Sequence, residues 1–167
     1  MSYFELILSK FIQGLFKIYP RFIQAYDGYN IFKFRKECQK MTQDTLLFFN
    51  SRPQALPLYE CFEQKLLSEL GSANIKVQKT QIAFSNKHYF TFVSFLPVRK
   101  AKERPETYIV ITFGLGRRVE SPRIDAAVEP YPNRWTHHVL ISDPDEINEE
   151  LMGWVKEAAA FSDAKRR

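Results

Sequence analysis

Three β-rich segments joined by short connections lie between residues 75 and 115, and they restrict the folds open to this chain more than any other feature. Residues 75–85 form one extended stretch with or without a bulge or corner, and residues 88–96 and 107–115 have strong β propensity. The connections are too short to contain the helix that a parallel crossover needs. The three segments therefore predict an antiparallel meander.

Local start and stop signals predict a helix on each side of this meander. Pro57 stands in the first turn of one helix, apolar residues recur along it at helical spacing, and Gly71 caps its end. Asp143, Pro144 and Glu146 have the spacing of a capping box with proline at the first helical position. The capping box predicts that the closing helix begins at Pro144.

The remaining segments complete an α+β domain. Residues 45–50 predict a short helix, and residues 135–141 predict a last strand that a basic connection, residues 116–133, joins to the meander. The whole pattern predicts a single antiparallel sheet of about four to five strands, flanked by an N-terminal and a C-terminal helix. This single domain is expected to span residues 41–167.

The positive charge is concentrated at the N-terminal end of the chain. Residues 1–40 hold seven Lys or Arg against three Asp or Glu, which accounts for +4 of the net charge of +5. Residues 2–19 have the periodicity of an amphipathic helix, which is typical of helices on a membrane surface and of helices packed on a domain. A third interpretation is that residues 1–40 precede the native start, because composition changes at Met41.

Charge and cysteine content suggest the compartment and the partners. The charge of +1 left for residues 41–167 attracts a phosphate backbone weakly, so nucleic acid is not an expected partner. Cys38 and Cys61 form neither a Cys-x-x-Cys pair nor a cluster with histidine, as is usual in a reduced cytoplasm. Neither a membrane-spanning run nor a secretory signal is recognisable. We expect a cytoplasmic protein, with residues 2–19 as the one candidate for contact with a membrane surface.

Several short motifs in a fixed order resemble a known family. They are Leu58-Tyr59-Glu60, Gln-Lys-Thr-Gln-Ile-Ala-Phe at 78–84, Phe-Thr-Phe-Val at 90–93, Ser121-Pro122-Arg123 and Trp-Thr-His-His at 135–138. Together they resemble the bacterial domain of unknown function 5655, over about residues 42–160. The resemblance implies an antiparallel sheet flanked by helices, and it implies no established activity and no catalytic residues.

The motifs of the common enzyme classes are missing from the sequence. There is no Gly-x-Ser-x-Gly elbow and no phosphate-binding loop, and Gly114-Leu115-Gly116 lacks the third glycine of a dinucleotide fingerprint. His137 and His138 are adjacent on a predicted strand, so their side chains point to opposite faces and do not chelate one metal. Neither a metal nor a cofactor is predicted.

One group of cationic and aromatic residues is the candidate binding site. Its members are Lys79, Arg118, Arg123, Trp135, His137 and His138. Arginine forks suit carboxylates and phosphates, and loops that follow strand ends can converge on a ligand. The alternative is a solvated basic loop whose arginines form ion pairs with Glu120, Asp125 and Glu129, with Trp135 packed in the core.

Three hypotheses for function follow from these residues. The leading one is a binding module without catalytic activity for a small anionic or nucleotide-like ligand. The second is an enzyme in which His137 or His138 acts as a general base and Arg118 stabilises a developing anion. The third is a protein–protein interaction domain that uses a sheet edge or residues 88–96, which requires an exposed apolar patch. The oligomeric state is left open.

Overall fold

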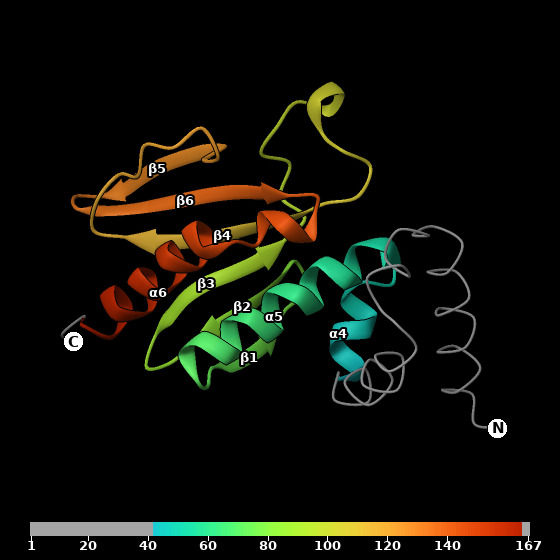
Figure 1. Cartoon of the computed structure of the whole chain (residues 1–167), viewed down its shortest axis with the longest axis horizontal. Helices are drawn as coiled ribbons and strands as arrows, with labels where there is room; N and C mark the ends of the chain where they lie inside the picture. The colour runs from blue at the N-terminus through green and yellow to red at the C-terminus, as the bar shows by residue number, and fades with distance from the viewer. Residues whose placement is uncertain (1–41, 165–167) are drawn as a thin grey trace. The chain divides into compact units, whose positions relative to one another are not determined.

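The structure is a computed structural model that describes residues 42–164 (Figure 1). The chain divides into two compact units after Leu47. The described part of the first unit is residues 42–47, which include most of the short helix α4 (Gln43–Phe48). The second unit contains the whole β-sheet and the two long helices, α5 (Leu56–Leu70) and α6 (Glu149–Asp163).

A single antiparallel sheet of six strands forms the centre of the second unit. The strands lie in the order β1-β2-β3-β4-β6-β5, and every neighbouring pair is antiparallel. Their bounds are β1 Asn74–Val77, β2 Gln81–Ser85, β3 Tyr89–Ser94, β4 Ile109–Leu115, β5 Ala126–Tyr131 and β6 Arg134–Ile141. The predicted α+β class and antiparallel sheet are confirmed, but the predicted number of about four to five strands is too low.

One difference is that residues 75–85 form a hairpin instead of one extended stretch. The chain reverses at residues 78–80, so that Val77 lies opposite Ile82. The turn is closed by the N–H of Gln78, which donates to the carbonyl of Gln81 (2.9 Å). The segment contains no Gly, Pro, Asn or Asp, and these are the residues that normally mark a turn in a sequence.

A second difference is β5, which the sequence analysis assigns to a connecting loop. This strand lies at the edge of the sheet and pairs only with β6, with a shift in register between Val128 and Tyr131. Glu129 and Pro130 lie inside it, and residues 128–131 are exposed. Charged residues, proline and irregular register protect an edge strand from pairing with other chains, and they also remove the alternation that identifies a strand.

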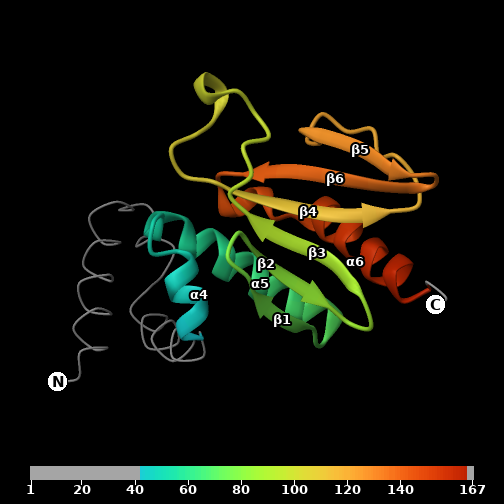
Figure 2. The same ribbon diagram turned by 180° about the vertical axis from the view of Figure 1, so that it is seen from behind.

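Both long helices pack on the same face of the sheet (Figures 1 and 2). Phe84 of β2 contacts the ring of Phe62 in α5 edge to face, with centroids 5.7 Å apart. Phe113 of β4 stacks on Trp154 in α6 at 5.8 Å. Because Phe84 and Phe113 both lie opposite Thr91 of β3, the strand register puts them on one face. The main core therefore lies between the sheet and these helices.

Neither α5 nor α6 covers the other face of the sheet, which Figure 2 shows from the front. A small apolar cluster covers one end of this face: Tyr108, Val110, Leu140 and Val98. Elsewhere on the face Phe92 is half-buried, and its ring lies 5.8 Å from that of Tyr89, which is 44% exposed. This side of the sheet thus presents aromatic side chains to solvent.

The helix ends confirm one capping prediction and correct another. Gly71 ends α5 with a φ of 78°, a conformation that glycine adopts without strain. The capping box of Asp143 and Glu146 exists, but it caps a separate 3-10 turn (Pro144–Glu146). Helix α6 starts only at Glu149, where the side chain of Asn148 accepts the N–H of Leu151 (3.2 Å).

The sequence predictions for residues 1–40, including the amphipathic helix over residues 2–19, lie outside the described residues. Within residues 42–164, no helix is both long enough and apolar enough to cross a membrane.

Candidate functional site

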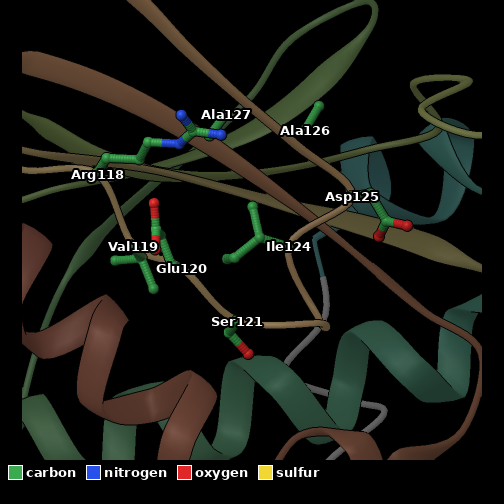
Figure 3. A pocket seen from close by; sticks show the side chains of 8 residues that line it. All are labelled: Arg118, Val119, Glu120, Ser121, Ile124, Asp125, Ala126 and Ala127. Carbon is green, nitrogen blue, oxygen red and sulfur yellow. The ribbon is translucent and has the colours of Figure 1, made fainter.

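A pocket of about 330 Å³ lies where the loop after β4 meets the start of β5 (Figure 3). It is lined by residues of that loop and by the first two residues of β5: Arg118, Val119, Glu120, Ser121, Ile124, Asp125, Ala126 and Ala127. The side chains of Arg118 and Glu120 are exposed, and Ile124, Ala126 and Ala127 supply an apolar wall. The pocket thus combines charged groups with a small apolar surface.

Strand β6 holds both ends of the pocket loop. The N–H of Val119 donates to Nε2 of His137 (2.9 Å), a side chain that is completely buried. At the other end, the N–H of Asp125 donates to the carbonyl of His138 (2.9 Å). The loop wall of the pocket is therefore positioned by the two histidines of β6.

Arg118 is the cationic residue of this pocket. Its Cζ lies 5.5 Å from the centroid of the Trp135 ring, and Figure 3 shows its side chain along one edge of the pocket. No carboxylate within residues 42–164 forms an ion pair with it. An arginine stacked on an aromatic ring keeps its N–H groups available at the edge of the guanidinium plane.

Arg123 and Arg117 are neutralised by α6 and the residue before it. Arg123 donates to Oδ1 of Asn148 (2.7 Å) and to a carboxylate oxygen of Glu150 (3.1 Å). Arg117 makes two hydrogen bonds to Glu157, at 2.9 and 2.6 Å. These arginines fasten the pocket loop to α6, and Arg123 is absent from the pocket lining.

Lys79 lies far from the pocket in the sheet. It is exposed at the turn between β1 and β2, and β1 and β5 are the opposite edges of the sheet. The predicted convergence of Lys79 with Arg118 is therefore not found.

His137 lies on the helix-covered face and has a structural environment. Its ring is stacked on Phe113 with centroids 5.2 Å apart. Because Nε2 accepts the N–H of Val119, the proton of the neutral ring is on Nδ1, which is buried without a hydrogen bond of normal geometry. Burial lowers the pKa of His137, and the charge of Arg117 adds to this effect, while the backbone of Phe113 opposes it.

His138 points to the opposite face of the sheet, as the sequence predicts for adjacent strand residues. It is half-buried, and its Nδ1 lies 2.9 Å from Oγ1 of Thr112. Burial lowers its pKa, and the carboxylate of Asp125 partly offsets this effect. That carboxylate also forms an ion pair with Arg99 and accepts the N–H of Leu140 (2.7 Å).

Of the predicted site residues, only Arg118 lines the pocket; Trp135 contacts its guanidinium, His137 supports the loop, and His138 lies outside the lining. Residues 47–162 match the protein family described as Domain of unknown function (DUF5655). The chain belongs to the DUF5655 family. The resemblance predicted from the sequence motifs is thereby confirmed. Comparisons with curated proteins and with solved structures gave no match.

Most of the residues around Arg118 in this DUF5655 domain could not be placed from the sequence. Glu120 and Asp125 are expected to pair with arginines of their own loop, but Asp125 pairs with Arg99 from another connection. The apolar wall at Ile124 cannot be recognised in the sequence, because Ile124 lies in an irregular loop next to an edge strand. Thr112 is recognisable only from the register of β4 and β6, which places it opposite His138.

No metal centre is suggested by the described part of the DUF5655 domain. Within residues 42–164, no three His, Cys, Asp or Glu side chains are grouped so that they could hold a metal ion. The single cysteine in this range, Cys61, is half-buried in α5, and burial raises the pKa of its thiol above the ordinary value. The chemistry at the pocket is therefore that of a guanidinium, a carboxylate and an apolar wall.

Proposed function

We propose that this DUF5655 domain is a binding module for a small ligand that carries one carboxylate or phosphate group, which Arg118 recognises in the pocket beside β5. The observation that carries the proposal is the guanidinium of Arg118, which lines the pocket, stacks on Trp135 and has no carboxylate partner within residues 42–164. The neighbouring Arg117 and Arg123 are both paired with α6.

The stacking supports recognition of an oxyanion. A ring beneath the guanidinium restricts its plane, and the in-plane N–H fork can then bind two oxygens of one carboxylate or phosphate. The backbone of Trp135 is held in β6 opposite Leu115 of β4, and the residue is half-buried. Arg118 therefore loses less side-chain entropy on binding than a fully mobile surface arginine would.

The volume and charge of the pocket narrow the ligand class. A volume of about 330 Å³ is at the lower end of the range for ligand sites, so it suits a small metabolite. Glu120 on the rim opposes additional negative charge, which makes a ligand with one anionic group a better fit than a polyphosphate. Ile124, Ala126 and Ala127 can contact a short apolar body.

A binding assay on the full chain tests the proposal. Thermal shift and calorimetric titration should reveal saturable binding of glycerol 3-phosphate or AMP, which carry one phosphate group. Binding of 2-oxoglutarate and ATP, which carry more than one anionic group, should be weaker. The R118M variant should weaken that binding by about 10- to 100-fold, because it removes charge-assisted hydrogen bonds worth roughly 1.5–3 kcal/mol.

The matched control is R117M, which removes the same charge from the adjacent residue outside the pocket lining and breaks only a solvent-exposed ion pair, a kind that contributes little stability. It should bind the probe as the unmodified chain does. Equal affinity of the unmodified chain and R118M for every probe would overturn the proposal, and so would equal losses in R118M and R117M.

The other two hypotheses stay predictions. An enzyme with a histidine base needs an imidazole oriented by a carboxylate, and within residues 42–164 neither His137 nor His138 forms a hydrogen bond to one. An interaction domain needs an exposed apolar patch, and Tyr89 and Leu96, at the two ends of the predicted strand 88–96, are 44% and 46% exposed. On the sheet edge, Val128 and Tyr131 of β5 are 55% and 67% exposed. These side chains do not indicate the chemistry of a partner.

A further inference from the structure

Two arginines from different connections converge on one tyrosine at the other end of β4. Arg52 precedes the short 3-10 turn before α5, Arg104 follows the 3-10 turn Ala101–Glu103, and Tyr108 immediately precedes β4. The Cζ of Arg52 lies 5.2 Å from the centroid of the Tyr108 ring, and Nη1 of Arg104 lies 3.5 Å from the Tyr108 hydroxyl. None of these residues lines the Arg118 pocket.

The two guanidinium groups have no counter-charge within residues 42–164. Arg99, Arg117 and Arg123 each form an ion pair with a carboxylate, whereas neither Arg52 nor Arg104 forms one. Glu103 and Glu106 flank Arg104 in the sequence, but neither forms an ion pair with it. Two cations are thus held near one phenol without a partner of opposite charge.

One donor of this cluster is also buried without an acceptor. Nε of Arg104 is inaccessible to solvent and has no hydrogen-bond partner, although buried N–H groups of charged side chains are normally paired. Arg52 is compensated in part by aromatic faces, because its Cζ also lies 4.7 Å from the Phe95 ring centroid. Within residues 42–164 no such face contact is seen for Arg104, so its positive charge is less well compensated than that of Arg52.

The electrostatic environment of Tyr108 also favours a nearby negative charge. The side chain is 4% exposed, and burial alone would raise the pKa of its phenol. Hydrogen bonds and charges from Arg52 and Arg104 outweigh burial, so that the pKa of Tyr108 is lowered. The potential at the hydroxyl therefore favours negative charge.

We propose that Arg52, Arg104 and Tyr108 form a second binding site, which takes one oxyanion group, a phosphate or a carboxylate. The anion accepts terminal N–H groups of both guanidiniums and neutralises the two cations. The site is independent of the Arg118 pocket, because Arg118 follows the C-terminal end of β4 and Tyr108 precedes its N-terminal end.

Inorganic phosphate and acetate are the probes that test this site on the full chain. Titrations at constant ionic strength, with chloride as the balancing anion, should show saturable binding of one probe or both, and the stronger one identifies the preferred oxyanion. The R52M and R104M variants should each weaken that binding by about 10-fold or more. R117M is the control for the loss of one exposed arginine.

Three further variants keep the test decisive. R118M should keep the component of saturable binding that R52M and R104M weaken, whatever it loses at the Arg118 pocket, and this separates the two sites. If R104M does not fold, R104K keeps the charge without the fork, and Y108F keeps the ring without the hydroxyl; at least R104K should bind more weakly. Absence of saturable binding by the unmodified chain, or unchanged affinity in R52M and R104K, would rule the second site out.

Discussion

At the scale of single residues, His137 connects the buried core to the wall of the pocket. Its Nε2 can accept the N–H of Val119 only while the ring is neutral. Burial lowers the pKa of this imidazole in the folded state, whereas the value in an unfolded chain is about 6.5. Because the unfolded chain takes up the proton more readily, stability is retained above about pH 6.5 and lost as the pH falls below it.

We expect the free energy of unfolding to decrease by up to about 1.4 kcal/mol per pH unit for each such histidine as the pH falls from about 6.5 toward the lowered folded-state pKa. His138 contributes in the same direction, since burial also lowers its pKa. The H137Q variant keeps an acceptor for Val119 and should lose only the His137 share of the slope. Urea unfolding at several pH values measures this slope.

H88Q is the matched control, because it removes the third histidine from the turn between β2 and β3. It should leave the contribution of His137 to the pH dependence in place. A slope in H137Q that equals that of the unmodified chain would show that protonation of His137 is not linked to unfolding.

The roles of the arginines could be predicted from the sequence only as a class. Their number and positions predict oxyanion recognition or ion pairing. Ion pairs are found for Arg99, Arg117 and Arg123, whereas oxyanion recognition stays a proposal. Whether an arginine forms an ion pair or is left without one depends on partners 25 to 40 residues away in the sequence. Arg117 and Arg123 form ion pairs with α6, and Arg118 forms none within residues 42–164. Arg52 gave no signal at all, because it stands alone in a helix-breaking segment and meets Arg104 only in the folded chain.

At the scale of elements, Asn148 determines where α6 begins. Its Oδ1 accepts the N–H of Leu151 (3.2 Å) and also a hydrogen bond from Arg123 (2.7 Å). We expect N148A to lower the free energy of unfolding by about 1–2 kcal/mol, since it removes the helix cap and leaves one donor of Arg123 unpaired. Denaturant titration measures the change.

The N148D variant is the control, because a carboxylate can accept both hydrogen bonds. It should retain the stability of the unmodified chain, and D143A should affect only the preceding 3-10 turn. If N148A and N148D were equally stable, Asn148 would not be the functional cap of α6.

Elements with strong periodicity or strong caps were predictable, and elements without them were not. Helix α5 and strands β3, β4 and β6 follow from apolar patterning and the cap at Gly71. The β1–β2 hairpin and β5 do not, because the turn at 78–80 lacks the usual turn residues and β5 contains Pro130. Tertiary pairing with β2 and β6 overrides these weak local signals.

At the scale of the whole sheet, the two faces differ in how they are covered. Helices α5 and α6 cover one face, and neither lies on the other (Figures 1 and 2), where Val98 packs against a small cluster of Tyr108, Val110 and Leu140. Two phenylalanines on neighbouring strands allow the faces to be compared. Phe84 of β2 faces the helices and is completely buried, whereas Phe92 of β3 lies on the other face and is half-buried.

Because the two faces are covered differently, the same Phe→Ala substitution on neighbouring strands should lower the free energy of unfolding by different amounts. F84A should lower the free energy of unfolding by about 3–5 kcal/mol, because it leaves a cavity between the sheet and α5. F92A should cost about 1–2 kcal/mol, since it removes a ring that already contacts solvent. Both values come from urea unfolding of the full chain at one protein concentration. If F92A lowered the free energy of unfolding as much as F84A does, the face that carries Phe92 would be covered in solution. If the effect of F92A also depended on protein concentration, the covering molecule would be a second copy of the chain.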